Sequence, residues 1–361
     1  MMKVYGSKIS YYTGKLESYL RYKGLPYQRV SPYANQKTIR QNVGAMQMPI
    51  VERADGRWMS DTTPIILQLE KEHPAPSVLP ANPVIRFLAL LIEDYADEWL
   101  WRSAMHYRWS YAHDRELLSS IIVDELMGEV PLPRFLKRRI IQLRQRRGFV
   151  IGDGVRAETW DHVEAGYFAA LDNMSRMLEK RPFLLGDAPS LADFGLMAPM
   201  LRHFGQDPTP VDIMRDRAPA AYAWVSRVWN ARPPGGMHNF VDEIPSDAAP
   251  MLQEVCETHL EQLAANAIAY AAGPRRFSMT IQSCDYIEMP VSRYRVVCLE
   301  RLRAAFSELS IEAQDTLREW LPHSQAKILW SPTPPAASGY DEQRQAPFGK
   351  AINVYAKGYP R

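Results

Sequence analysis

The sequence predicts an α/β domain with a mixed four-stranded sheet, followed by an all-helical bundle domain and a C-terminal extension. Short strand-like and helical segments alternate over the first 76 residues, whereas longer helical periodicity dominates from residue 84 onward. A proline-rich linker over residues 73–83 separates these two regions. Further helical segments and a strand-like stretch follow from about residue 246. The expected domains are therefore residues 1–76, 84–240 and 246–361.

The composition excludes several classes of protein. Of the 361 residues, 46% are apolar and 23% are charged, which is an ordinary balance for a soluble protein with hydrophobic cores. A formal net charge of +2 gives no indication of nucleic acid as a partner. The longest apolar run, residues 87–92, is far shorter than the roughly 20 residues of a membrane helix, and no secretory signal is evident. We therefore expect a cytoplasmic protein without membrane insertion.

Metal, disulfide and nucleotide chemistry are also not indicated. The three cysteines lie in the last third of the chain and lack CxxC spacing, so neither a zinc site nor a disulfide framework is predicted. The sequence contains no GxGxxG motif after a strand and no Walker, HExxH or GxSxG motif. No metal cofactor is expected.

The first domain is predicted to have the order β-α-β, helix, β-β-α. The successive elements are expected at residues 3–6, 15–23, 27–30, 35–43, 49–52, 57–59 and 62–69. The opening β-α-β unit should be parallel with a right-handed crossover. Asp55-Gly56 lies between two short strands, which is a hairpin signal. This order of elements is the plan of a thioredoxin-like domain.

Two parts of the sequence resemble the glutathione transferase superfamily. SYYTGKLESYLRYKGLPYQ, followed by QMPIVERADGRWMSDTTPIILQLEKEHP, is similar to its N-terminal domain. FLLGDAPSLADFGLMAPM, residues 183–200, is similar to the signature of its helical domain. Together the similar stretches cover most of residues 1–235 and look like a Ser-type-like member with a C-terminal extension. The resemblance implies a detoxification enzyme that uses glutathione as co-substrate and forms a homodimer.

Ser10 is the catalytic residue that the resemblance implies, because the family places a Ser, Tyr or Cys there against the glutathione sulfur. Free N–H groups and the helix dipole at a helix N-terminus favour an anion. A hydroxyl that donates to the thiolate lowers the pKa of the thiol. Ser10 could instead only cap the helix, and Tyr11, Tyr12 or Thr13 would take the role if the alignment shifted. The absence of Cys at position 10 argues against thiol exchange.

The resemblance assigns glutathione binding to six residues, namely Tyr12, Gln47, Met48, Pro49, Asp61 and Thr62. The Met48-Pro49 bond is expected to be cis, which turns the Met48 backbone toward the cysteinyl residue of glutathione. Asp61 is expected to meet the γ-glutamyl ammonium, while Thr62 and the helix N-terminus hold its carboxylate. A trans proline and a simple helix cap are the respective alternatives.

Residues 93–109 are dense in aromatic and charged side chains. In the family this helix forms one wall of the pocket for the electrophile. The resemblance therefore offers as pocket candidates Tyr11, Trp99, Trp101, Met105, His106 and Trp109. Core packing is the alternative for each of them. The aromatic content of the segment is also a reason to expect a homodimer.

Three further segments carry expectations of their own. Ser190 and Asp193 form a predicted capping box with a folding role. The basic residues 134–147 predict a solvated helix face, with anion or membrane-surface binding as the alternative. The tail after Trp330, rich in Pro, Ser and Gly, is expected to be an extended arm or disordered, and it could cover the active site or brace a dimer.

The activity that these expectations favour is activation of the glutathione thiolate for attack on an apolar, electrophilic small molecule. An ether-cleaving lyase or a glutathione-dependent reductase is an alternative enzyme. A non-catalytic ligand-binding or scaffold protein that kept the fold is the alternative from another class.

Overall fold

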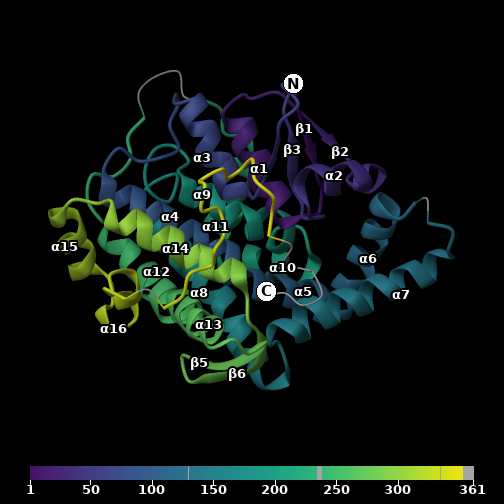
Figure 1. The fold of residues 1–361 in the computed structure, drawn as a ribbon. Coiled ribbons are helices and arrows are strands. Elements are labelled where there is room, and N and C mark those ends of the chain that lie inside the picture. Colours follow the sequence, from purple (N-terminus) through teal and green to yellow (C-terminus); the bar gives the residue numbers. More distant parts are fainter. Residues whose placement is uncertain (129, 234–237, 334, 353–361) are drawn as a thin grey trace.

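The computed structural model describes residues 1–128, 130–233, 238–333 and 335–352. The first part of the chain forms the predicted thioredoxin-like domain, drawn in purple in Figure 1. Its elements are β1 (Met2–Tyr5), α1 (Tyr11–Tyr22), β2 (Tyr27–Val30), α2 (Gln36–Val43), β3 (Ile50–Glu52), β4 (Trp58–Ser60) and α3 (Thr62–Glu72).

The sheet has the order β2-β1-β3-β4 and is mixed, as predicted. β2 is parallel to β1, whereas β3 is antiparallel to β1 and β4 is antiparallel to β3. Alternating side chains bury both faces of the sheet. Val4 and Val51 belong to the main core with α1 and α3, while Tyr5 and Ile50 form a smaller cluster with α2. β4 is an edge strand, so the backbone on its outer side can pair with another segment of the chain.

The helical domain begins after the linker. Its helices are α4 (Pro83–Glu98), α5 (Leu100–Ser110), α6 (Ala112–Leu126), α7 (Arg134–Gln145), α8 (Trp160–Leu178), α9 (Leu191–Pro199), α10 (Pro208–Arg217) and α11 (Pro219–Asn230). The segment 84–111 forms two helices, joined at Trp99. There the N–H of Arg102 donates to the carbonyl of Trp99, three residues back, so the turn is tighter than an α-helical one.

Helix α9 lies at the centre of the molecule, with α1 and α4 packed against it. Every residue of α9 is buried. The predicted capping box is confirmed, since Asp193 accepts from the backbone N–H and the hydroxyl of Ser190. Gly195 permits the close approach of α4, because a Cβ at this position would lie 2.6 Å from Cα of Glu93. α9 thereby fixes the position of the N-terminal domain against the helical domain.

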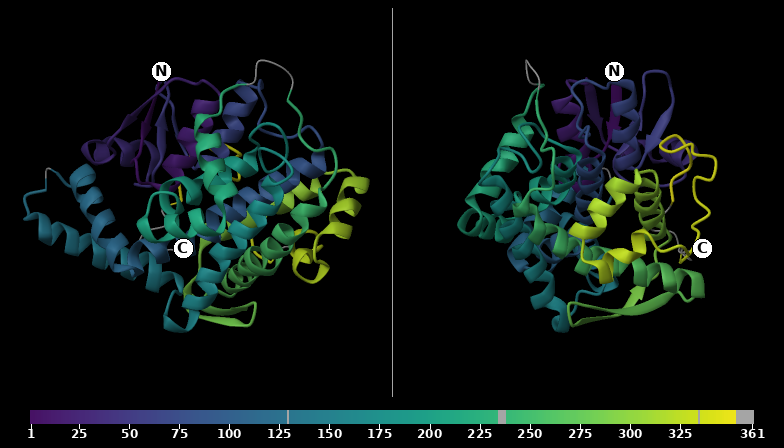
Figure 2. Two further views of the ribbon diagram at one scale, coloured as in Figure 1. Left: turned by 180° about the vertical axis from the view of Figure 1, so that it is seen from behind. Right: turned by 90° about the vertical axis from the view of Figure 1, so that its left-hand side faces the viewer.

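Helices α6 and α7 form a hairpin that projects from the body (Figures 1 and 2). Arg134 pairs with Asp124 and Arg138 with Glu116, so two arginines of the basic segment are used within the hairpin. The far end of the segment, with Arg144 and Arg147, reaches the cavity described below.

The extension packs onto the helical domain and shares its core. Its elements are α12 (Ala249–Glu254), α13 (Glu261–Ala272), β5 (Arg276–Ile281), β6 (Cys284–Pro290), α14 (Arg293–Ser307), α15 (Ile311–Trp320) and α16 (His323–Ala326). α14 and α15 lie against α4, and α13 lies against α14. β5 and β6 form an antiparallel hairpin. The predicted strand-like stretch is therefore a hairpin between two core helices.

The tail, residues 335–352, crosses back to the N-terminal domain, as the yellow trace in Figure 1 shows. The N–H of Ser60 in β4 donates to the carbonyl of Pro347 at 3.0 Å. The N–H of Ala351 donates to the carbonyl of Val43 at 2.9 Å. The Lys350 ammonium donates to two carbonyls at the end of α2, at 2.6 and 2.8 Å. Of the alternatives for the tail, the described part is an ordered arm along the N-terminal domain.

Among the described residues, none of the helices combines the length and the apolar character that a membrane span requires.

Candidate active site

A cavity of about 710 Å³ lies where the N-terminal domain, the helical domain and the extension meet. The predicted glutathione-binding residues all line it, namely Tyr12, Gln47, Met48, Pro49, Asp61 and Thr62. The wall from the helical domain includes Asp97, Glu98, Trp101, Arg144, Arg147 and Phe149. The wall from the extension and tail includes Ser292, Tyr294, Arg295, Tyr340, Ala351 and Ile352. The structure thus brings together six residues that lie in three separate segments of the N-terminal domain.

The predicted cis bond between Met48 and Pro49 is confirmed. It lies directly before β3, on the wall of the cavity. The side-chain oxygen of Gln47 is buried and has no hydrogen-bond partner within the described residues. A buried acceptor of this kind is costly unless a donor satisfies it. The region before β3 is therefore suited to a polar ligand.

Ser10 is the N-cap of α1, and its hydroxyl accepts from the N–H of Thr13 at 3.4 Å. Ser10 is not among the residues that line the cavity, whereas Tyr12 is. The Tyr12 hydroxyl donates to the carbonyl of Asp97 at 2.9 Å, and its ring stacks on Trp101 with centroids 5.6 Å apart. The capping role of Ser10 is confirmed, and its role toward a thiol stays a prediction.

Of the six pocket candidates, only Trp101 lies on the cavity wall. The other five, Tyr11, Trp99, Met105, His106 and Trp109, are buried in the core and are absent from the cavity lining. The Tyr11 hydroxyl donates to the carbonyl of Ala96. His106 is hydrogen-bonded to Glu164 at 2.9 Å, and burial lowers the pKa of its imidazole. These five residues therefore have the alternative role, which is packing in the core.

A buried ion network beneath the N-terminal wall joins α1, α3 and α4. Lys15 is fully buried and contacts Glu93, Asp97 and the hydroxyl of Thr63. The Lys15–Asp97 distance is 2.5 Å. Burial raises the pKa of the Asp97 carboxyl, while Lys15 opposes that shift. Because a buried charge is costly unless it is paired, this network holds the three helices in one arrangement under the cavity.

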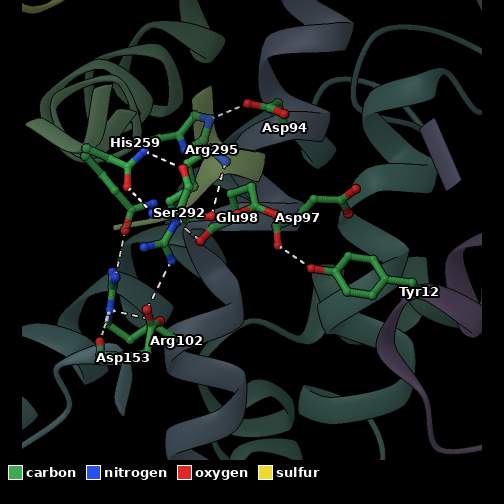
Figure 3. A network of polar contacts seen from close by, with 11 residues as sticks. Tyr12, Asp94, Asp97, Glu98, Arg102, Asp153, His259, Ser292 and Arg295 are labelled. Carbon is green, nitrogen blue, oxygen red and sulfur yellow. Dashed lines mark hydrogen bonds and ion pairs between the residues drawn. The ribbon is translucent and has the colours of Figure 1, made fainter. Parts of the chain in front are cut away.

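A second network connects the helical wall with the extension (Figure 3). Arg295 of α14 lies 3.1 Å from an oxygen of Asp153 and 3.6 Å from Glu98. Arg102 donates to the carbonyl of Asp153 at 2.9 Å and to Gln262 at 2.7 Å. Burial raises the pKa of Glu98 to about 8, against the opposing effect of Arg295. The cavity is therefore lined by a carboxyl that holds its proton more strongly than a free glutamic acid does.

Asp61 is engaged by the extension. It precedes α3 with a φ of 72°, and its carboxylate accepts from the Tyr294 hydroxyl at 2.9 Å. The other carboxylate oxygen lies 2.9 Å from the Arg301 guanidinium. Sequence reasoning missed both partners because they come from α14, more than 230 positions along the chain, and no local signal ties them to Asp61.

Within the described residues there is no cluster of three or more His, Cys, Asp or Glu side chains that could hold a metal ion.

The chain thus combines a thioredoxin-like domain, with a cis-proline at the cavity, and a helical domain. Two family models match the chain: the glutathione S-transferase N-terminal domain over residues 4–77 and the C-terminal domain over residues 157–227. The chain therefore carries the N- and C-terminal domains of the glutathione S-transferase family, and its region beyond residue 227 is additional to both domains.

Several solved structures are similar to this chain at low identity. The beta-etherase LigF from Sphingobium sp. strain SYK-6 is 23% identical, with a TM-score of 0.46, and the match covers 64% of this chain and 96% of that one. A glutathione S-transferase from Rhodospirillum rubrum F11 is 19% identical, with a TM-score of 0.42 and coverages of 70% and 92%. FzlA from C. crescentus is 17% identical, with a TM-score of 0.41 and coverages of 70% and 91%. No curated protein sequence matches the chain.

Proposed function

We propose that this protein is a glutathione transferase that binds glutathione on the N-terminal wall of the cavity. The observation that carries the proposal is the convergence of Tyr12, Gln47, Met48, Asp61 and Thr62 around the cis bond before Pro49. The cavity volume of about 710 Å³ falls in the usual range for small-molecule sites. Membership of the family supports the same reading.

In the proposed binding mode, the cysteinyl and γ-glutamyl residues of glutathione meet different features. The backbone of Met48 pairs with the cysteinyl residue, and the unsatisfied Gln47 oxygen accepts from the peptide. Thr62, at the first turn of α3, holds the γ-glutamyl carboxylate, because a hydroxyl and free N–H groups at a helix N-terminus favour an anion. The sulfur then lies toward the N-terminus of α1.

The activating hydroxyl in this proposal is Ser10, with Tyr12 as its competitor. Ser10 has the helix N-terminus in its favour, and Tyr12 has its place on the cavity wall. The thiolate then attacks an electrophilic small molecule held against Trp101 and Phe149. We propose that the electrophile is aromatic, because these two rings lie edge to face, with centroids 5.7 Å apart, on the helical wall. Ether cleavage begins with the same thiolate attack and belongs to the same proposal.

A cytoplasmic homodimer completes the proposal. The support for a dimer is the family alone, because the aromatic side chains of residues 93–109 that suggested it are mostly used in the core of one chain. Sedimentation at micromolar concentration should give about twice the chain mass of 41.3 kDa. A monomer would remove the dimer from the proposal and leave glutathione binding untouched.

The non-catalytic alternative has one observation in its favour. The expected counter-ion of the ligand, Asp61, is already partnered by Tyr294 and Arg301. A protein of this kind would bind glutathione weakly and would not shift the pKa of its thiol.

The test of binding is calorimetry with glutathione. Thr62→Val removes a hydrogen bond to a charged carboxylate, which is worth about 1.5–3 kcal/mol, and should weaken binding by roughly tenfold or more. Thr38→Val, an exposed threonine of α2 outside the cavity, is the matched control and should bind as the wild type does. If the wild type shows no measurable binding, the transferase proposal is wrong.

The test of activation is a pH titration of thiolate absorbance in the complex. Ser10→Ala and Tyr12→Phe each remove one hydroxyl. A charge-assisted hydrogen bond of about 1.5–3 kcal/mol corresponds to roughly one to two units of thiol pKa. The variant that raises the apparent pKa of the bound thiol identifies the activating group. Unchanged titration curves in both variants would favour the non-catalytic alternative.

A further inference from the structure

We propose that Arg301 and Tyr294 determine specificity by holding Asp61, so that the site recognises a carboxylate-bearing thiol without using its ammonium group. This inference rests on the proposed function, since it concerns how glutathione would bind. It goes beyond that function because Asp61 is expected to bind the γ-glutamyl ammonium, whereas the inference predicts that this ammonium contributes little to binding.

Both oxygens of the Asp61 carboxylate lie against side chains of α14, one through a hydrogen bond and the other through an ion pair that lacks hydrogen-bond geometry. The Tyr294 hydroxyl donates to Oδ1 and the Arg301 guanidinium lies against Oδ2, each at 2.9 Å. The guanidinium also lies over the Tyr294 ring, 5.9 Å from its centroid, so the two partners support each other. The Asp61 side chain is only 14% exposed, and the pair is therefore weakly screened by salt.

The two partners stand on a rigid element. Ser292 caps α14, and Leu299 and Leu302 anchor the helix in the core. Arg295, one turn after Ser292, is fixed by Asp153 and Glu98 in the network of Figure 3. Arg301 thus reaches Asp61 from a helix that core packing and the ion pairs of Arg295 hold in place.

The charge balance at Asp61 determines what the site can attract. A free carboxylate would attract the γ-glutamyl ammonium strongly in a partly buried site. The guanidinium of Arg301 lies at hydrogen-bond distance from the same carboxylate and repels an ammonium placed beside it. Because the two effects oppose each other at similar distances, the ammonium should contribute little to binding.

Recognition then depends on the features that Arg301 leaves unchanged. These are the helix N-terminus at Thr62, which suits a carboxylate, and the backbone before Pro49, which suits the peptide of a cysteinyl residue. The site is therefore suited to a cysteinyl thiol with a carboxylate at the γ-glutamyl end, whether or not that end carries an amino group.

The experiment compares glutathione with glutaryl-cysteinyl-glycine, which has a hydrogen in place of the α-amino group. Calorimetry with the wild type should give dissociation constants within about threefold of each other. Arg301→Gln leaves Asp61 uncompensated and should tighten glutathione binding by roughly tenfold, while the analogue changes by less than about twofold. Arg301→Lys keeps the charge and should keep the wild-type ratio.

Arg303→Gln is the matched control. Arg303 lies on the same helix, but its guanidinium donates to the carbonyls of Ile328 and Ser331. The Arg303→Gln variant should have the same ratio of affinities for glutathione and the analogue as the wild type. A wild type that prefers glutathione by tenfold or more would overturn the inference, and so would an unchanged ratio in Arg301→Gln.

The failure of this inference differs from the failure of the proposed function. If both ligands bind and Arg301→Gln does not change their ratio, only the role of Arg301 is wrong. If neither ligand binds to the wild type or to any variant, both proposals are wrong.

Discussion

Replacement of Glu98 by glutamine should change how the stability of the protein depends on pH. Burial raises the pKa of this carboxyl from 4.5 to about 8, with Arg295 opposing and the carboxylates of Asp94, Asp153 and Asp61 adding to the rise. The folded protein therefore binds a proton that the unfolded chain releases near pH 4.5. The resulting stabilisation is complete below that pH and is lost as the pH rises through 8.

The magnitude follows from the interval between the two pKa values. Each pH unit between them removes about 1.4 kcal/mol of stability, and the full effect is on the order of 4–5 kcal/mol. Glutamine has the shape of the protonated acid and cannot ionise. If the two proteins are equally stable below pH 4.5, where both side chains are neutral, Glu98→Gln should exceed the wild type by about 2 kcal/mol at pH 6 and by about 4–5 kcal/mol at pH 9.

The assay is urea unfolding followed by tryptophan fluorescence at pH 6, 7, 8 and 9, with the difference between variant and wild type as the readout. The contributions of titratable groups that the two proteins share cancel in that difference of unfolding free energies. Glu308→Gln, at the exposed end of α14, is the control for loss of one carboxyl and should run parallel to the wild type. If Glu98→Gln also runs parallel from pH 6 to 9, then Glu98 is ionised in the folded protein and the reasoning is refuted.

Three further predictions concern stability and use the same unfolding assay. Lys15→Met leaves the buried carboxylates of the α1–α3–α4 network without their cation and should cost about 3–5 kcal/mol; a loss below about 1 kcal/mol would contradict a paired network. Gly195→Ala should cost about 1–3 kcal/mol because its Cβ would lie 2.6 Å from Cα of Glu93, whereas Gly148→Ala, with no atom within 4 Å, should be nearly neutral. Ser190→Ala removes half of the capping box and should cost about 1 kcal/mol; an unchanged midpoint would show that Asp193 suffices.

The N-terminal domain was predictable from the sequence because its signals are local. Two strand segments flank Asp55-Gly56, and Thr62 begins α3 as expected. The cis bond before Pro49 and the capping box at Ser190 depend on residues close in sequence. The same locality explains why the predicted glutathione-binding residues converge on one wall: the fold of a small domain determines where its few loops meet.

The wall that the helical domain contributes to the cavity was less predictable, because the phase of a helix decides which of its side chains face the cavity. The tight turn at Trp99 rotates α5 relative to α4, so Trp101 faces Tyr12 while Trp99 packs against Arg102 and Tyr286. A pattern read through Val84–Tyr111 as one helix cannot include that rotation. The resemblance pointed to a segment that reaches the cavity, but of its six pocket candidates only Trp101 lines the wall.

The extension was the least predictable part. Its contributions to the cavity depend on contacts such as Arg295 with Glu98 and Tyr294 with Asp61, which join residues nearly 200 positions apart or more. Charged residues on an amphipathic helix do not specify long-range partners. Only the packing of α14 against α4 brings them to the site.

The bonds between the tail and the N-terminal domain have a consequence for synthesis of the protein. The ribosome releases β4 early, but the carbonyl that pairs with Ser60 belongs to Pro347 and the N–H that pairs with Val43 belongs to Ala351. Until residues 347–351 are made, the nascent sheet therefore has an unpaired edge at Ser60, which is a surface that other strands can join. Arrest of translation before these residues emerge should leave a folded but association-prone intermediate.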